Sequence, residues 1–170
     1  MTMTRRDVLA TGVAGSTLWG VGVAPAQAQV VPPVSALDAA SLAIVRVWVP
    51  IVIGDSALPS DPTARANTIA LVAQRAGELV SNYHPMNQAA VQGLFTTLKQ
   101  GPQIFNPAFP PTWEAVPPAA LSALLDALRL SASASQRAIY SAFMGIIPNA
   151  HYSNPANWSA INYPGPPSFK

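Results

Sequence analysis

The chain has 170 residues, of which half are hydrophobic, 9% are charged and none is cysteine. A soluble domain usually has about 25% charged residues, so this chain is unusually poor in charge, and its hydrophobic content disfavours intrinsic disorder. The absence of cysteine excludes a disulfide framework, an iron–sulfur cluster and a thiolate zinc site. A net charge of +2 disfavours nucleic-acid binding, because the sequence contains no basic patch.

Residues 1–28 have the organisation of an export signal. Arg5 and Arg6 precede a weakly apolar, glycine-interrupted stretch, and the small residues Ala26 and Ala28 suggest a cleavage site after Ala28. The arginine pair and the mild apolar core predict a twin-arginine signal and therefore export of a folded protein to a bacterial periplasm. The alternatives are a chance arginine pair or an uncleaved membrane anchor, but a spanning helix needs about 20 strongly apolar residues. We therefore expect a signal peptide over 1–28 and one domain over 29–170.

The expected domain is nearly neutral and has few charges. Of the nine basic and seven acidic residues, only Arg5, Arg6 and Asp7 lie in the signal. Soluble surfaces usually contain about 25–35% charged side chains, and a surface with few charges and little net charge favours association. Serine, threonine, asparagine and glutamine could cover part of it. We interpret the composition as indicating a surface that a partner covers.

Apolar residues recur at helical spacing along the domain. The pattern predicts helices over about 35–50, 61–83, 86–100, 119–130 and 136–147, with a short helix at 155–161. Asp38 and Asp61 have the positions of N-terminal caps, and Pro62 follows in the first turn, where its missing N–H costs nothing. No strand pattern of useful length occurs. The sequence therefore predicts an all-α fold: a single compact bundle of about five helices.

Two irregular segments interrupt this helical pattern. Residues 101–118 form a long proline-rich loop, whose aromatic side chains indicate that it packs against the bundle rather than acting as a flexible linker. The C-terminal tail ends in a proline-rich stretch over 163–167 that cannot be regular. Loops of this length are often functional, so both segments are candidate interaction regions.

Motifs for catalysis are scarce. The domain lacks a nucleophile elbow and a phosphate-binding glycine loop. His84 and His151 are the two histidines, and they could meet with Asp55 or Glu78 as a third ligand or orienting acid, although no known ligand spacing supports this. Each histidine lies at a predicted helix end, where capping or partial burial is the commoner role. We expect no catalytic residue, cofactor site or metal site in this chain.

The aromatic residues of the loop and tail are the candidate partner interface. Such residues are enriched at the centres of interfaces, where charge is depleted, but they also close the ends of helical cores. For Trp158 and Tyr163 we favour packing on the bundle, and for Phe169 we favour contact with a partner. The candidates are Phe105, Phe109, Trp113, Tyr152, Trp158, Tyr163 and Phe169.

The tail carries a resemblance to a known family. The order of a tyrosine, Asn154-Pro155, Trp158 and Tyr163-Pro164-Gly165-Pro166-Pro167, behind a twin-arginine signal and a helical domain, resembles the gluconate 2-dehydrogenase subunit 3 family. The similarity is close over 151–167 and rests on helix pattern alone over 35–150. Some members contain cysteine in this subunit, and this chain has none.

The resemblance implies a non-catalytic role. Members of this family bind a large FAD-containing subunit of the glucose–methanol–choline oxidoreductase type that oxidises a sugar, sugar acid or polyol. A cytochrome c subunit commonly receives the electrons. The large subunit often has no signal of its own and is exported folded together with the small subunit. The resemblance supplies no active-site residue for this chain.

Two other functions stay open at this level. The chain could be a stand-alone periplasmic binding or adaptor protein in which loop 101–118 lines a pocket for an apolar ligand. Alternatively, it could be an enzyme that uses His84 and His151. The substrate of any complex cannot be read from this sequence, because the specificity would lie in another chain.

Overall fold

The computed structural model describes residues 35–161 and residue 164, all of which lie in the unit Pro33–Lys170. Five α-helices follow one another, with no strand among the described residues: α2 (Ala39–Ile53), α3 (Pro62–Ser81), α4 (Pro85–Leu98), α5 (Pro118–Leu130) and α6 (Ala134–Tyr152). Short 3-10 helices lie between and after them: η1 (Asp55–Ala57), η2 (Pro102–Ile104), η3 (Trp113–Ala115) and η4 (Pro155–Ile161). The predicted all-α bundle of five helices with a proline-rich loop is confirmed.

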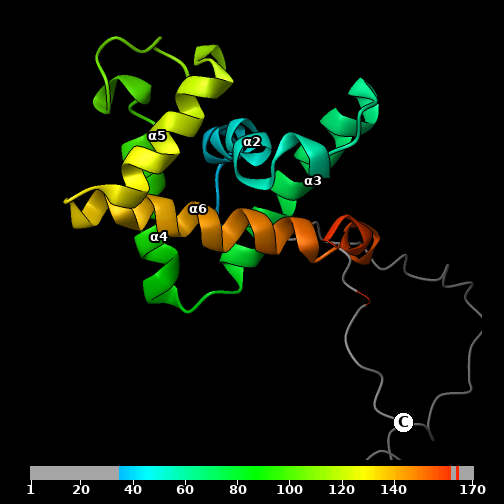
Figure 1. The fold of residues 1–170 in the computed structure, drawn as a ribbon. Helices are drawn as coiled ribbons and strands as arrows, with labels where there is room; N and C mark the ends of the chain where they lie inside the picture. The colour runs from blue at the N-terminus through cyan, green and yellow to red at the C-terminus, as the bar shows by residue number, and fades with distance from the viewer. Residues whose placement is uncertain (1–34, 162–163, 165–170) are drawn as a thin grey trace, which may run out of the picture. The chain divides into compact units, whose positions relative to one another are not determined.

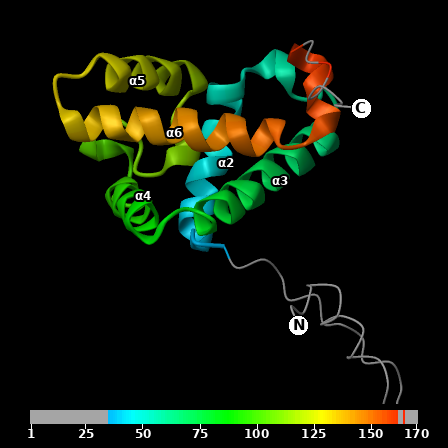
Figure 2. The same ribbon diagram turned by 90° about the horizontal axis from the view of Figure 1, so that it is seen from below.

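α6 is the central helix of this unit (Figures 1 and 2). α2, α3 and α5 all pack against it, and α2 also contacts α3 and α5. α4 makes smaller contacts with α2, α3 and α6. A short turn over 131–133 joins α5 to α6, so that α5 folds back along its neighbour.

The helix starts follow from local chemistry. The Asp38 Oδ1 accepts a hydrogen bond from the Ser41 N–H at 2.8 Å, and the Asp61 Oδ1 accepts one from the Ala64 N–H at 2.7 Å. Each carboxylate therefore satisfies a backbone donor that the helix itself leaves free. Both predicted caps are confirmed, as is the proline in the first turn of α3.

Two helices continue past prolines where the sequence predicted that they would end. α2 was expected to end near Pro50 and α6 near Ile147, yet α2 extends to Ile53 and α6 extends through Pro148 to Tyr152. Proline removes one intrahelical hydrogen bond, which usually ends a helix. Here the following turn is held by burial, since Ile51 packs partly against the core and Ala150 is fully buried. Apolar burial offsets the lost bond.

The core is centred on aromatic rings from separate elements. Trp48 of α2 stacks on Phe143 of α6 with ring centroids 4.7 Å apart, and it contacts Trp113 of η3 at 5.6 Å. Phe95 of α4 meets Phe143 edge-on at 6.4 Å. All four side chains are buried. Offset and edge-on aromatic contacts add to the stabilisation from burial alone.

Two contacts fix the course of the proline-rich loop. Gly101 has φ +95°, and a Cβ there would lie 2.8 Å from the Pro111 carbonyl oxygen, so only glycine allows this close approach. Further along, the buried Trp113 Nε1 donates a hydrogen bond to the Leu98 carbonyl at 2.9 Å. The prediction that the aromatic residues of this loop pack against the protein is confirmed: Trp113 is buried, and Phe105 and Phe109 lie partly buried against the core.

Candidate partner-binding surface

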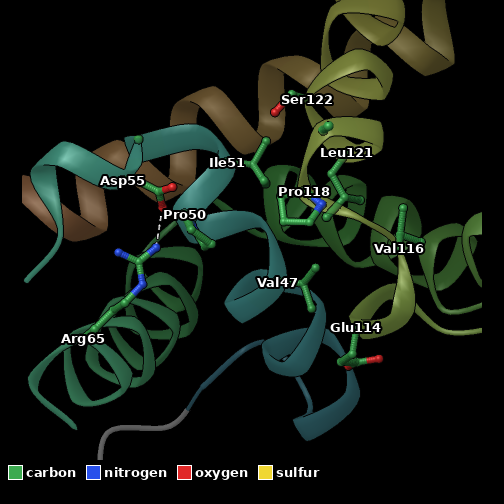
Figure 3. A pocket seen from close by; sticks show the side chains of 12 residues that line it. Val47, Pro50, Ile51, Asp55, Arg65, Glu114, Val116, Pro118, Leu121 and Ser122 are labelled. Carbon is green, nitrogen blue, oxygen red and sulfur yellow. Dashed lines mark hydrogen bonds and ion pairs between the residues drawn. The ribbon is translucent and has the colours of Figure 1, made fainter. Parts of the chain in front are cut away.

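A groove of about 650 Å³ lies between the C-terminal half of α2 and the N-terminal end of α5 (Figure 3). Its walls are mostly apolar. Val47, Pro50 and Ile51 come from α2, and Val116 and Leu121 come from the entry to α5 and its first turn. We call this the α2–α5 groove. Its volume lies within the range of about 300–1,000 Å³ that is usual for ligand sites.

Charged groups lie at opposite ends of the α2–α5 groove, as Figure 3 shows. Asp55 accepts a hydrogen bond from the Arg65 guanidinium, so these two charges neutralise each other. At the other end, the exposed Glu114 carboxylate makes no hydrogen bond or ion pair with the described residues. The groove therefore offers an apolar floor, a neutralised pair at one end and an unpaired negative charge at the other.

A second, smaller groove lies on the other side of α5. It has a volume of about 340 Å³ and is formed by Phe105 and Phe109 of the proline-rich loop facing Ala123, Leu124 and Ala127 of α5. We call this the loop–α5 groove. No charged side chain lines it. Two of the aromatic residues chosen from the sequence as interface candidates thus face an open apolar groove.

α5 connects the two grooves, because different faces of this one helix line each of them. The residues of α5 between and beside the grooves are small or apolar, and Leu130 at its end is 74% exposed. The charged side chains of this helix, Asp126 and Arg129, form an ion pair at 3.4 Å. This surface is therefore apolar and close to neutral, which is the character that interface centres have and free surfaces usually lack.

The remaining interface candidates divide into three groups. Trp113 is only 4% exposed, so it belongs to the core and is removed from the set of residues that a partner could contact. Tyr152 and Trp158 are half-buried at the end of α6, where the Trp158 Nε1 donates a hydrogen bond to the Tyr152 carbonyl at 2.7 Å. Tyr163 and Phe169 lie outside the described residues. So do the signal residues Arg5, Arg6, Ala26 and Ala28.

The two histidines have separate roles. His84 is exposed and caps α4, with its Nδ1 accepting a hydrogen bond from the Met86 N–H at 3.4 Å. His151 is buried in the last turn of α6. The two acids considered with them are engaged elsewhere: Asp55 pairs with Arg65, and Glu78 accepts a hydrogen bond from Gln74. Within the described residues, no three histidine, aspartate or glutamate side chains form a group that could hold a metal ion.

Sequence reasoning missed the α2–α5 groove, although one signal was available. Val47, Pro50 and Ile51 have the spacing of one face of α2, and Gly54 follows at its C-cap with the same spacing. The partner of that face, the segment Val116–Pro118, is the end of the proline-rich loop, some sixty residues later. That pairing is tertiary, and no local pattern specifies it.

No protein-family model matches this chain, and neither a curated protein nor a solved structure matches it. Among the described residues, none of the helices has the length and apolar character needed to cross a membrane.

Proposed function

We propose that this chain is the non-catalytic small subunit of a periplasmic FAD-dependent dehydrogenase, and that it binds the FAD-containing subunit through the surface around α5. The observation that carries the proposal is the pair of apolar grooves on either side of α5, which a chain so poor in charge leaves open. Covering apolar surface is worth roughly 25 cal/mol per Å², before the costs of association.

The sequence supports the chemical class of the partner. The residues of the tail from Tyr152 to Pro167 resemble those of the small subunits that accompany flavoprotein dehydrogenases, and Arg5-Arg6 is typical of signals that export folded proteins. A folded-export signal is useful to a chain whose partner must bind its flavin before it crosses the membrane. In this proposal FAD belongs to the partner, a cytochrome c subunit can complete the complex, and the small subunit contributes binding, stabilisation and export.

The test is a deletion in the native host. Without this chain, we expect the FAD-containing subunit to remain in the cytoplasm or to aggregate, and periplasmic dehydrogenase activity with an artificial electron acceptor to disappear. With the chain present, the purified complex should show flavin absorbance in a fixed ratio to both polypeptides. Full periplasmic activity in the deletion strain would exclude the proposed function.

Substitutions on α5 test the surface. Ser122→Arg places a charge in the α2–α5 groove and Ala127→Arg places one in the loop–α5 groove, whereas Ala138→Arg is a matched control on the exposed side of α6. Burying an unpaired guanidinium costs well over 1.4 kcal/mol, so each groove variant should weaken the complex by about tenfold or more. Unchanged affinity in both groove variants would mean that the partner binds elsewhere.

A second function is favoured by one observation, the volume of the α2–α5 groove. A groove of about 650 Å³ is large enough for a small apolar ligand, as a stand-alone periplasmic binding protein would require. In that case the chain would purify as a monomer without flavin and with a bound ligand that could be extracted. The Ser122→Arg variant would no longer retain that ligand, whereas the Ala127→Arg variant would. Co-purification of a flavoprotein in fixed ratio separates the two functions.

A further inference from the structure

His151 is the buried titratable group that the proposed function does not use. It lies in the last turn of α6, is 1% exposed, and its ring meets the Tyr152 ring edge-on with centroids 4.7 Å apart. Burial opposes the charged form of the ring.

The η4 segment is fastened to the same turn by two side chains. The Asn157 Nδ2 donates a hydrogen bond to the His151 carbonyl at 2.8 Å and lies 3.4 Å from the His151 Nδ1. The Trp158 Nε1 donates to the Tyr152 carbonyl at 2.7 Å. The last two carbonyls of α6 are thereby capped by the segment that follows it. The position of η4 thus depends on the turn that contains His151.

The surroundings of the ring suit only its neutral form. The Asn157 amide nitrogen can only donate, so a hydrogen bond between it and the neighbouring Nδ1, 3.4 Å away, requires Nδ1 to be unprotonated and the ring proton to lie on Nε2. The Nε2 atom is buried without a hydrogen-bond partner. The charged group that acts on the ring is a cation, Arg75 of α3, and Tyr152 is the adjacent titratable side chain. Burial and, to a lesser extent, Arg75 lower the pKa of His151 below its ordinary value.

Protonation of the His151 ring would be unfavourable at three points. A proton on Nδ1 would face the NH₂ group of Asn157, and the buried charge would have Arg75 as its neighbour and no acceptor at Nε2. Turning the Asn157 amide around would offer its oxygen to Nδ1–H but would break the bond from its nitrogen to the His151 carbonyl. The ring can therefore be charged at low cost only if it reaches water.

We propose that His151 is an acid-sensitive latch: when its imidazole takes up a proton, the last turn of α6 opens and η4 detaches from it. Opening is coupled to the uptake of one proton. Between the native pKa of His151 and the ordinary histidine pKa of about 6.5, the equilibrium constant for opening then rises about tenfold for each unit by which the pH falls. This inference does not depend on the identity of the partner.

The test uses the intact chain. NMR signals of the His151 ring should show it titrating at a pH below the ordinary histidine range. In parallel, hydrogen exchange of the amides over 151–161, corrected for its intrinsic pH dependence, should accelerate as the pH falls from 7.5 to 5. Amides in the middle of α3 serve as the internal reference and should keep their protection.

Variants distinguish a latch from a purely structural histidine. His151→Gln removes the titration and should abolish the acid response of the 151–161 amides, whereas the matched His84→Gln should leave it intact. Arg75→Gln removes the neighbouring cation and should move the response to higher pH without abolishing it. This shift keeps the proposal testable if His151→Gln fails to fold.

Several results would overturn the proposal. The latch does not exist if His151 titrates in the wild-type protein while exchange over 151–161 stays constant. It is also excluded if His84→Gln removes the response, or if Arg75→Gln leaves the midpoint unchanged or lowers it.

Discussion

The aromatic core and the surface around α5 use similar apolar residue types with opposite results. In the core, Trp48, Phe143 and Trp113 come from three elements, and none of them is more than 4% exposed. Around α5, Phe105 and Phe109 face small side chains across an open groove. The difference lies in what meets each ring: large rings interlock in the core, whereas alanines leave space at the surface.

This contrast separates the parts of the chain that stabilise the fold from those that are available for binding. The aromatic rings of α2, α4, α6 and the proline-rich loop meet inside the protein, so a change there should affect folding first. α5 also contributes the buried Leu121 and Leu128 to the core, but its exposed residues in the grooves do not, so a change at these exposed positions should affect binding first. The following substitutions test the distinction, beginning with the largest expected effect on stability.

Trp48→Ala should have the largest effect. The side chain is fully buried and contacts two other rings, so truncation loses apolar burial and leaves a cavity that costs about 3–5 kcal/mol. Denaturant unfolding followed by circular dichroism measures the change in the free energy of unfolding. A loss below about 1 kcal/mol would show that the aromatic cluster does not hold the bundle together.

Trp113→Phe tests how the proline-rich loop is attached. The substitution keeps an aromatic ring but removes the hydrogen bond from Nε1 to the Leu98 carbonyl, which retains its bond from the Gly101 N–H at 3.0 Å. We expect a loss of about 2 kcal/mol, from the lost hydrogen bond together with the smaller ring. Limited proteolysis of the loop should become faster in parallel. Unchanged stability and unchanged cleavage would contradict this role.

Asp38→Asn tests the charged start of α2. The hydrogen bond from Ser41 and the contact with the Lys99 ammonium at 2.9 Å hold the pKa of Asp38 well below its usual range. Because the native pKa is lowered, this stabilisation is present above about pH 4 and is lost as the pH falls below it. Asparagine keeps the capping oxygen but not the charge, so the variant should show less loss of stability on acidification. Thermal unfolding between pH 2 and 7 measures how steeply the stability falls on acidification. The same pH dependence in the variant and the wild type would contradict this role of the Asp38 charge.

Ser122→Arg and Ala127→Arg should have the smallest effects on stability. Both positions are exposed on α5, and arginine is a good helix former, so the free energy of unfolding should change by less than about 0.5 kcal/mol. The same variants are expected to weaken partner binding. A destabilisation comparable to that of Trp113→Phe would show that these two positions of α5 support the fold rather than being free for binding.

Much of the fold could be predicted from the sequence, because its strongest signals are local. Asp38 and Asp61 mark helix starts through side-chain chemistry that acts over three residues. The helix ends at Pro50 and Ile147 were wrong, because burial of the following turn is a tertiary effect that overrides the proline. Trp113 was placed among surface candidates for the same reason: its partners are Trp48 and the Leu98 carbonyl, from other elements.

The candidate site was less predictable than the fold. Phe105 and Phe109 were selected as aromatic residues of the proline-rich loop, but the α2–α5 groove depends on how two distant segments meet. The environment of His151 was also beyond local reasoning. Its position at a helix end suggested burial or capping, whereas the orphaned Nε2 and the nearby Arg75 are products of packing.

Pro148 also separates the last turn of α6 from the rest of the helix. Helical order spreads because each backbone hydrogen bond supports the next, and a residue without an N–H interrupts that chain of support. The four residues from Pro148's neighbour Asn149 to Tyr152 can therefore unwind as a small unit while the stretch that carries Phe143 stays wound. Opening of the last turn should therefore leave the buried stretch around Phe143 helical.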